Sequence, residues 1–197
     1  DANDFKPVYQ RMNRFVARRV QACVLAYGDS HATLSDVYPW AARLNISGPI
    51  EYADDLDQRF GRIPDTLAVS LTSNGGMQAV WPVDPMDPTS TCFAWPWWDA
   101  WKEQVFYAVN KNNAPAPSTG GDLQLDGVPA QFMVIVGGRA QSGQFRASVS
   151  EKGDIANFLE GDNMPGSGAG LIPNGDELFV TTSSNSNDVV CSDLSCS

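Results

Sequence analysis

Few residues of this 197-residue chain have the types and spacing that catalysis requires. The single histidine, His31, lies in the polar segment GDSHATLSD, and the nucleophile motifs G-x-S-x-G and S-x-x-K do not occur. The adjacent residues Asp29, Ser30 and His31 do not predict a catalytic triad, because a triad depends on roles in space and not on a string of residues. One histidine and no C-x-x-C pair also argue against a zinc site. We therefore expect a protein that is not an enzyme and has no cofactor, with His31 in a surface loop.

Two kinds of loop could instead bind phosphate or a metal ion. The segment GGRAQSGQ, residues 137–144, lacks the lysine and hydroxyl of a phosphate loop, so it indicates a turn between strands. Aspartates in Gly- and Pro-rich loops supply the oxygen ligands that calcium needs, although no EF-hand pattern occurs. These aspartates are Asp84, Asp87, Asp122, Asp126, Asp162 and Asp176. Solvated turn residues are the simpler interpretation, and a structural calcium site is the alternative.

Positive charge is concentrated near the start of the chain. Arg11, Arg14, Arg18 and Arg19 are four of only 13 Lys and Arg residues, against 23 Asp and Glu and a net charge of -10. Such an acidic protein repels nucleic acid and anionic lipid on average, but a local basic patch can still bind an anionic partner. The alternative interpretation is a solvated helix face.

Aromatic residues are concentrated in residues 95–101, which contain four of the six tryptophans. Such a cluster can stack on sugars or bind a protein partner. The helical spacing of these tryptophans favours packing in the core as the alternative. The candidate partner-binding residues are therefore Arg11, Arg14, Arg18, Trp97 and Trp98.

Four cysteines allow three disulfide pairings, and an even number in an acidic, lysine-poor chain fits an oxidising compartment. Cys191 and Cys196 are five residues apart and can close a small loop at the end of the chain. Cys23 would then pair with Cys92. The crossed pairings, which require the C-terminus to reach the first helix or the tryptophans, stay open at this point.

The clearest element is an amphipathic helix over residues 5–27. Apolar residues recur there at steps of three and four, which is the helical period. They are Phe5, Val8, Tyr9, Met12, Val16, Val20, Cys23, Val24 and Tyr27. Pro7 is tolerated in a first turn and Gly28 is a stop signal, so the helix would be about 34 Å long.

The rest of the chain is predicted to be rich in loops and to contain strands. Residues 67–72 and 77–83 predict a hairpin around Asn74-Gly75, and three prolines within residues 82–91 predict a loop. The apolar spacing of residues 97–109 predicts a second helix. Further strands are expected at 123–127, 130–138 and 177–182, a short helix at 154–161, and loops at 110–121 and 163–176.

Composition narrows the fold class. Hydrophobic residues make up 43% of the chain, which is enough for a core, while charged residues are only 18%. The length predicts one domain, with or without a small appendage. The expected class is α+β, with a long N-terminal helix packed on an antiparallel sheet.

Several segments follow the helix in an order that resembles a known family. They are YPWAA (38–42), WWDAWKEQVFYAV (97–109), VIVGGRA (134–140) and IANFLEGDN (155–163). Together with the helix, they resemble the type IV pilin-like proteins, specifically minor pilins or pseudopilins. The ending NDVVCSDLSCS resembles a pilin C-terminus that is closed by a disulfide.

This resemblance implies a single pilin-like domain over residues 1–197, with a helix at 1–28 and a globular head at 29–197. It implies a structural subunit of a type IV pilus or a related type II secretion filament, without catalytic residues. It implies contacts with other pilin subunits through the N-terminal helix. It also implies anchoring in the bacterial inner membrane through a hydrophobic, cleaved and methylated segment that would precede this chain. The expected location is the periplasm or the cell surface. The alternative on the same fold is a tip adhesin or a DNA-uptake module that binds DNA or a surface ligand.

Overall fold

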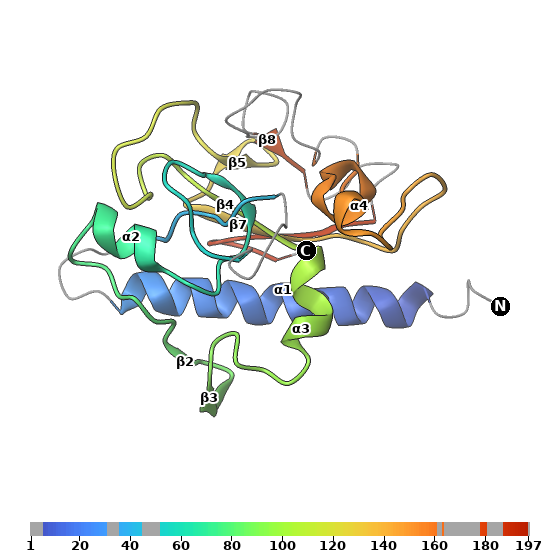
Figure 1. Cartoon of the computed structure of the whole chain (residues 1–197), viewed down its shortest axis with the longest axis horizontal. Helices are drawn as coiled ribbons and strands as arrows, with labels where there is room; N and C mark the ends of the chain where they lie inside the picture. Colours follow the sequence, from blue (N-terminus) through green and yellow to red (C-terminus); the bar gives the residue numbers. More distant parts are fainter. Residues whose placement is uncertain are drawn as a thin grey trace.

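The computed structural model describes residues 6–30, 36–44, 52–160, 163, 178–180 and 187–196. Its longest element is helix α1, Lys6–Asp29, which runs horizontally across the lower part of the view in Figure 1, with most of the chain above it. The helix predicted for residues 5–27 is therefore confirmed, with its end slightly later in the chain. Val16, Val20 and Val24 are almost fully buried, as the apolar spacing requires.

Helix α1 packs on a four-stranded antiparallel sheet, so the sheet and the helix predicted from the sequence are both present. The strands, in spatial order, are β1 (Phe60–Arg62), β4 (Val105–Val109), β7 (Phe132–Val136) and β9 (Val189–Ser192). The helix contacts β7 and β9. Strands β4 and β7 are continuous apolar runs because both of their faces are covered.

Side chains of the sheet alternate between two cores. On the α1 side, Val105 and Val134 join the buried face of the helix. On the other side, Phe106 and Ile135 belong to a second core, which a small three-stranded sheet covers. That sheet consists of β5 (Gln124–Leu125), β6 (Val128–Pro129) and β8 (Leu178–Phe179), which confirms strands within the predicted ranges 123–127 and 177–182.

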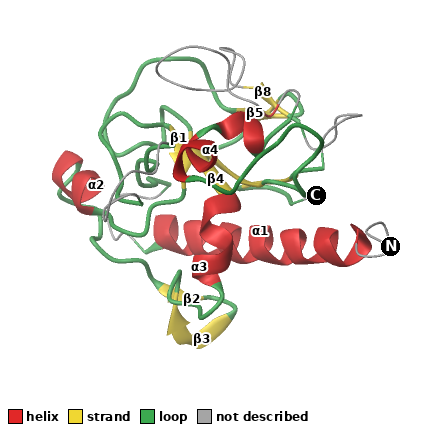
Figure 2. Ribbon diagram, turned by 45° about the vertical axis from the view of Figure 1, so that its right-hand side comes forward, coloured by secondary structure: helices red, strands yellow, loops and turns green. Residues whose placement is uncertain are grey.

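The remaining side of α1 is covered by residues 77–101, which we call the strap. It contains the ribbon formed by β2 (Val83–Asp84) and β3 (Asp87–Thr91), and the short helix α3 (Trp98–Trp101). In Figures 1 and 2 the ribbon lies on the side of α1 that faces away from the sheet. The C-terminal half of α1 is therefore enclosed between the sheet and the strap.

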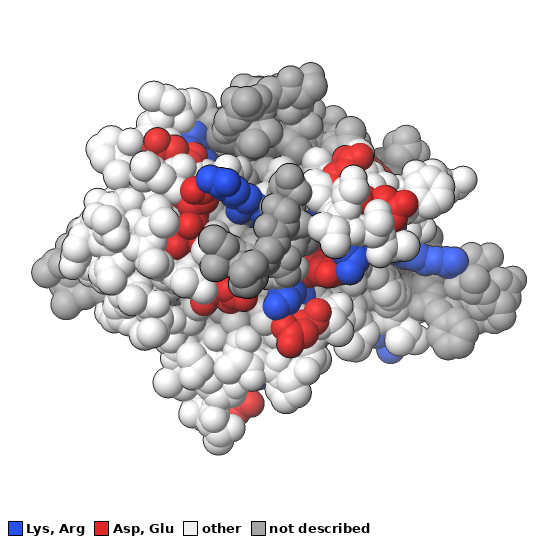
Figure 3. Space-filling model, viewed as in Figure 1, with Lys and Arg blue, Asp and Glu red and all other residues white. Residues whose placement is uncertain are grey.

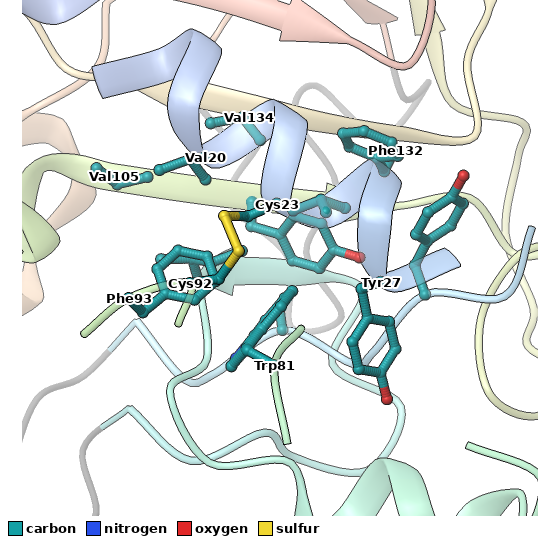
Figure 4. Close-up of a cluster of buried hydrophobic side chains, with 14 of the residues drawn as sticks. Val20, Cys23, Tyr27, Trp81, Cys92, Phe93, Val105, Phe132 and Val134 are labelled. Carbon is teal, nitrogen blue, oxygen red and sulfur yellow. A yellow bond between two sulfur atoms is a disulfide. The ribbon is translucent and has the colours of Figure 1, made fainter. Parts of the chain in front are cut away.

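A disulfide between Cys23 and Cys92 joins α1 to the strap, with a Cα–Cα distance of 5.8 Å. Trp81 and Phe93 of the strap belong to the same core, and the ring of Trp81 lies 5.0 Å from that of Tyr27 on the helix. Figure 4 shows Trp81 and Phe93 close to this disulfide, and Val105, Phe132 and Val134 of the sheet around the same part of the helix. The enclosed half of α1 is thus covalently fixed.

The hairpin predicted over residues 67–83 is wrong. Residues Ala68–Ser73 form helix α2, and residues 77–82 form no strand. The carboxylate of Asp54 accepts hydrogen bonds from the backbone N–H groups of Val69 and Ser70, and it caps the start of this helix. Because the capping residue comes from a distant segment, the local pattern of β-branched residues is misleading.

Three other element predictions need correction. In the range 97–109, α3 and the 3-10 turn η1 (Lys102–Gln104) are helical, but residues 105–109 form strand β4. Residues 82–91 are the β2–β3 ribbon and not a loop, because Pro88 stands on an edge strand, where its missing N–H is tolerated. The helix predicted at 154–161 is reduced to the 3-10 turn η2 (Ile155–Asn157), which follows helix α4 (Val149–Gly153).

Candidate functional site

The N-terminal half of α1 has an apolar stripe that the rest of the described structure leaves exposed. Val8, Met12 and Phe15 are 56%, 42% and 42% exposed, and spacings of four and three residues place them on one side of the helix. The sequence pattern predicts Val8 and Met12 in the buried stripe, and this is wrong. The sheet covers only one side of α1, and the strap covers the other side mainly along the C-terminal half, with Trp101 reaching Tyr9 and Trp97 reaching Phe15 at its edge.

Three arginines lie beside this apolar stripe. Arg11, Arg14 and Arg18 are all exposed, which both sequence interpretations expect. None of them forms an ion pair with a residue in the described ranges. We call the whole surface, stripe and arginines, the outer face of α1. It consists of Val8, Arg11, Met12, Arg14, Phe15 and Arg18.

The charge of α1 is opposite to that of the rest of the chain. The sequence Lys6–Asp29 contains five of the 13 Lys and Arg residues but only one of the 23 Asp and Glu residues. In the view of Figure 3, acidic and basic groups are interspersed over the globular part. The outer face is thus a positively charged, partly apolar surface on an acidic protein, and it favours partners with negative charge.

Arg19 does not belong to the outer face, although the sequence groups it with the other arginines. Its guanidinium lies 2.5 Å from Oδ2 of Asp84 and 3.5 Å from Oδ2 of Asp87, and its side chain is 13% exposed. It also stacks over the ring of Trp95, at 4.8 Å from the ring centre. Arg19 therefore fastens the strap to α1, and the basic patch is reduced to three residues.

The two candidate tryptophans have different surroundings. Trp98 is only 4% exposed and packs against Phe93 at 4.9 Å between ring centres, so its assignment as a partner-binding residue is wrong. Trp97 is half-buried and stacks on Trp95 at 4.7 Å. Its ring lies 5.9 Å from that of Phe15. Trp97 therefore borders the outer face and extends its apolar part onto the strap.

Two polar contacts hold this half of α1 against the head. The hydroxyl of Tyr9 donates a hydrogen bond to Oε1 of Gln104 at 2.7 Å, and burial raises the pKa of Tyr9 above its ordinary value. The buried side chain of Asn13 donates to the carbonyl of Gly137 at 3.4 Å. The outer face is therefore presented by a helix that is fixed on its opposite side.

One group of potential metal ligands occurs within the part of the chain that the structure describes, formed by Cys23, Asp84 and Cys92. Both sulfurs belong to the disulfide and Asp84 is paired with Arg19, so this group does not fit a metal ion in the oxidised protein. Among the aspartates considered for calcium, Asp122 pairs with Lys111. The remaining predicted residues Asp162, Asp176 and His31 lie outside the described residues.

A second disulfide, Cys191–Cys196, closes the C-terminal loop, so the structure has both pairings preferred from the sequence. Within the loop, the N–H of Ser192 donates to the carbonyl of Ser195 at 2.7 Å. The side chain of Gln21 on α1 donates to the Ser192 carbonyl and ties the loop to the helix. A pocket of about 140 Å³ beside this loop is lined by Leu125, Asp126, Val128, Pro129, Ser192, Leu194 and Ser195.

Sequence reasoning missed Phe15 and the location of the apolar surface. Phe15 stands among arginines on the polar side of the predicted helix, and an aromatic residue in that position is the signal that could have revealed it. No known family model, curated protein or solved structure matches this chain. Within the described ranges, no helix has both the length and the apolar character needed to cross a bilayer. The function must therefore be argued from the outer face itself.

Proposed function

We propose that this chain is a structural subunit of a type IV pilus or a related type II secretion filament, in the manner of a minor pilin or pseudopilin. The observation that carries the proposal is the division of α1 into two halves. The C-terminal half is enclosed by the sheet and the strap, whereas the N-terminal half presents Val8, Met12 and Phe15 to solvent. A pilin-like subunit needs a helix that is fixed in its own head and free to contact its neighbours.

The exposed stripe gives this contact a driving force. Burying a large apolar side chain completely stabilises an assembly by about 1.5–3 kcal/mol, and each stripe residue still has a large part of this area in solvent. Three such residues with Trp97 beside them form a continuous apolar border along the helix. Such patches mark interaction surfaces in soluble proteins.

The attachment of α1 to the head suits a subunit that must transmit force along a filament. The Cys23–Cys92 disulfide and the Arg19–Asp84 ion pair both connect the helix to the strap. Two disulfides also favour assembly in an oxidising compartment, either the periplasm or the cell surface. In this proposal, neighbouring subunits bind the outer face of α1, and a preceding hydrophobic segment anchors the subunit in the inner membrane before assembly.

Complementation tests this function. Cells that lack the gene should lose the filament or the secretion that depends on it, and the wild-type gene should restore it. Phe15→Glu should fail to restore it, because it removes the apolar ring and burying a carboxylate at a subunit contact costs several kcal/mol of desolvation. The matched control is Val80→Glu, which changes a 67% exposed strap residue. Both variant proteins should unfold thermally like the wild type, and full restoration by Phe15→Glu would refute the proposal.

A further inference from the structure

We propose that the outer face of α1 selects an acidic amphipathic helix of a different protein and rejects the α1 of a second copy. This inference rests on the proposed function and specifies the chemistry of the neighbour. Its basis is the arrangement of apolar and charged residues along the exposed half of the helix.

The apolar stripe has the spacing of a coiled-coil seam. Val8, Met12 and Phe15 are separated by four and then three residues, which are the steps between the a and d positions of a heptad. The next residue of the same seam is Arg19, whose side chain already contacts Asp84 and Trp95 of the strap. The open seam therefore spans about two helical turns and accepts a helix along its N-terminal part only.

The flank of this seam is positively charged. With Met12 at position a, both Arg11 and Arg18 fall at g, the position that chooses partners in coiled coils through opposite charges. The opposite flank consists of Tyr9 and Val16, which face the head. Tyr9 is half-buried and Val16 is buried. A partner helix therefore meets arginines on the one exposed flank of the α1 seam. Glutamates at the flanking positions of the partner helix complement the charge of these arginines.

A second copy of α1 does not supply this complement. Packed helices lie about 8–10 Å apart, which is close to the Debye length of about 8 Å at physiological salt, so charges on two facing helices are only partly screened. Each α1 exposes Arg11, Arg14 and Arg18, and its single acidic residue, Asp29, lies at its far end. Two copies side by side would therefore repel each other. Like charges of this kind are a common device for excluding a wrong partner.

The stripe also favours a helix over other anionic partners. A nucleic acid or an anionic bilayer would meet the arginines, but the chain outside α1 is strongly acidic and repels an extended polyanion. The apolar residues form a narrow row at heptad spacing, which matches the ridge of a second helix. An acidic amphipathic helix can pack its apolar side against this row and pair its carboxylates with the arginines.

A peptide-binding experiment tests the inference on the purified chain. The probe is a labelled 21-residue peptide with Leu at a and d and Glu at e and g, used where it is monomeric. The matched peptide has Gln at e and g. Fluorescence anisotropy should show that the Glu peptide binds about 10-fold more tightly at low salt, and that this preference falls to about 2-fold in 0.5 M NaCl.

Two variants locate the binding. Arg11→Glu/Arg18→Glu should remove the preference for the Glu peptide. Arg43→Glu/Lys111→Glu makes the same change in net charge at head positions away from α1 and should retain the preference. Circular dichroism and thermal unfolding confirm that both variants are folded.

Several outcomes would overturn the inference. Equal affinity for the two peptides would refute it, as would loss of the preference in the head variant. The chain alone could also dimerise at low salt. If Arg11→Glu/Arg18→Glu changed that dimerisation, a second copy would be the partner and the inference would be refuted. Binding to phosphatidylglycerol vesicles or to DNA through the same arginines, in preference to the peptide, would also refute it. Each result leaves the filament function intact if Phe15→Glu still fails in complementation, so the two proposals fail separately.

Discussion

Oδ2 of Asp84 accepts a hydrogen bond from Nε of Arg19 at 2.7 Å, so a carboxylate with no exposed surface neutralises one cation of α1. The same oxygen accepts a hydrogen bond from Nε1 of Trp95 at 2.8 Å. This contact marks the boundary between the two halves of the helix. On its N-terminal side α1 presents the outer face, and on its C-terminal side the strap encloses it.

The pair makes a prediction about stability. Arg19→Leu alone should lower the free energy of unfolding by about 3–5 kcal/mol, because it leaves the fully buried carboxylate of Asp84 without its ion-pair partner. Asp84→Leu alone should lower it by less, because Asp87 still lies 3.5 Å from the guanidinium of Arg19. The double variant Arg19→Leu/Asp84→Leu should be less destabilised than the sum of the single variants. Urea unfolding of the four proteins gives the coupling energy, and additive effects would show that the two residues do not act as a pair.

The buried stripe of α1 makes a second prediction. Val20 has no exposed surface, so Val20→Ala should lower the free energy of unfolding by about 1–3 kcal/mol through lost burial and an added cavity. Val8→Ala is the matched control, because Val8 is 56% exposed and its truncation should change stability by less than about 0.5 kcal/mol. A neutral Val20→Ala would contradict the packing of α1 on the sheet.

The disulfides differ in their expected contributions. Cys23–Cys92 closes a separation of 69 residues and Cys191–Cys196 one of five. Loop-closure entropy then gives about 4 kcal/mol for the first and about 2 kcal/mol for the second. Chemical unfolding of Cys23→Ala/Cys92→Ala and Cys191→Ala/Cys196→Ala should show this order. Peptide mapping without reduction should recover the same two pairs, and a crossed peptide such as Cys23–Cys191 would refute them.

The sequence predicted the parts of the fold that depend on local periodicity. Helix α1 repeats its apolar pattern over many turns, and the run that becomes β7 is apolar without interruption. Residues 105–109 were mistaken for helix because a strand buried on both faces has no alternation to distinguish it. Helix α2 was missed because Asp54, which caps it, comes from a segment distant in sequence.

The candidate site was predictable only in part. The clustering of Arg11, Arg14 and Arg18 is visible in the sequence, and all three are exposed. The pairing of Arg19 with Asp84 and the burial of Trp98 depend on how the strap folds back over the helix. No local pattern of residues encodes that tertiary contact.

Helix α4 predicts a pH dependence. Its capping box joins Ser148 and Glu151, and the backbone N–H of Ser148 bonds the Glu151 carboxylate at 2.7 Å and lowers its pKa below the ordinary value of 4.5. A lowered folded pKa means that the stabilisation is fully present above the ordinary pKa and is lost as pH falls through the folded value. The difference in unfolding free energy between wild type and Glu151→Ala should therefore be constant near neutral pH and shrink below about pH 4. A difference that grows on acidification would contradict this assignment.

Site-specific photo-crosslinking in cells tests the central claim most directly, namely that the outer face of α1 is the contact with neighbouring subunits. A photoreactive amino acid at Met12, which is 42% exposed on that face, should give a cross-linked product that contains another filament subunit by mass spectrometry. The same group at Val80, which is 67% exposed on the strap, should give none. A product from Val80 but not from Met12, or no subunit cross-link from Met12 in cells that assemble the filament, would contradict the account.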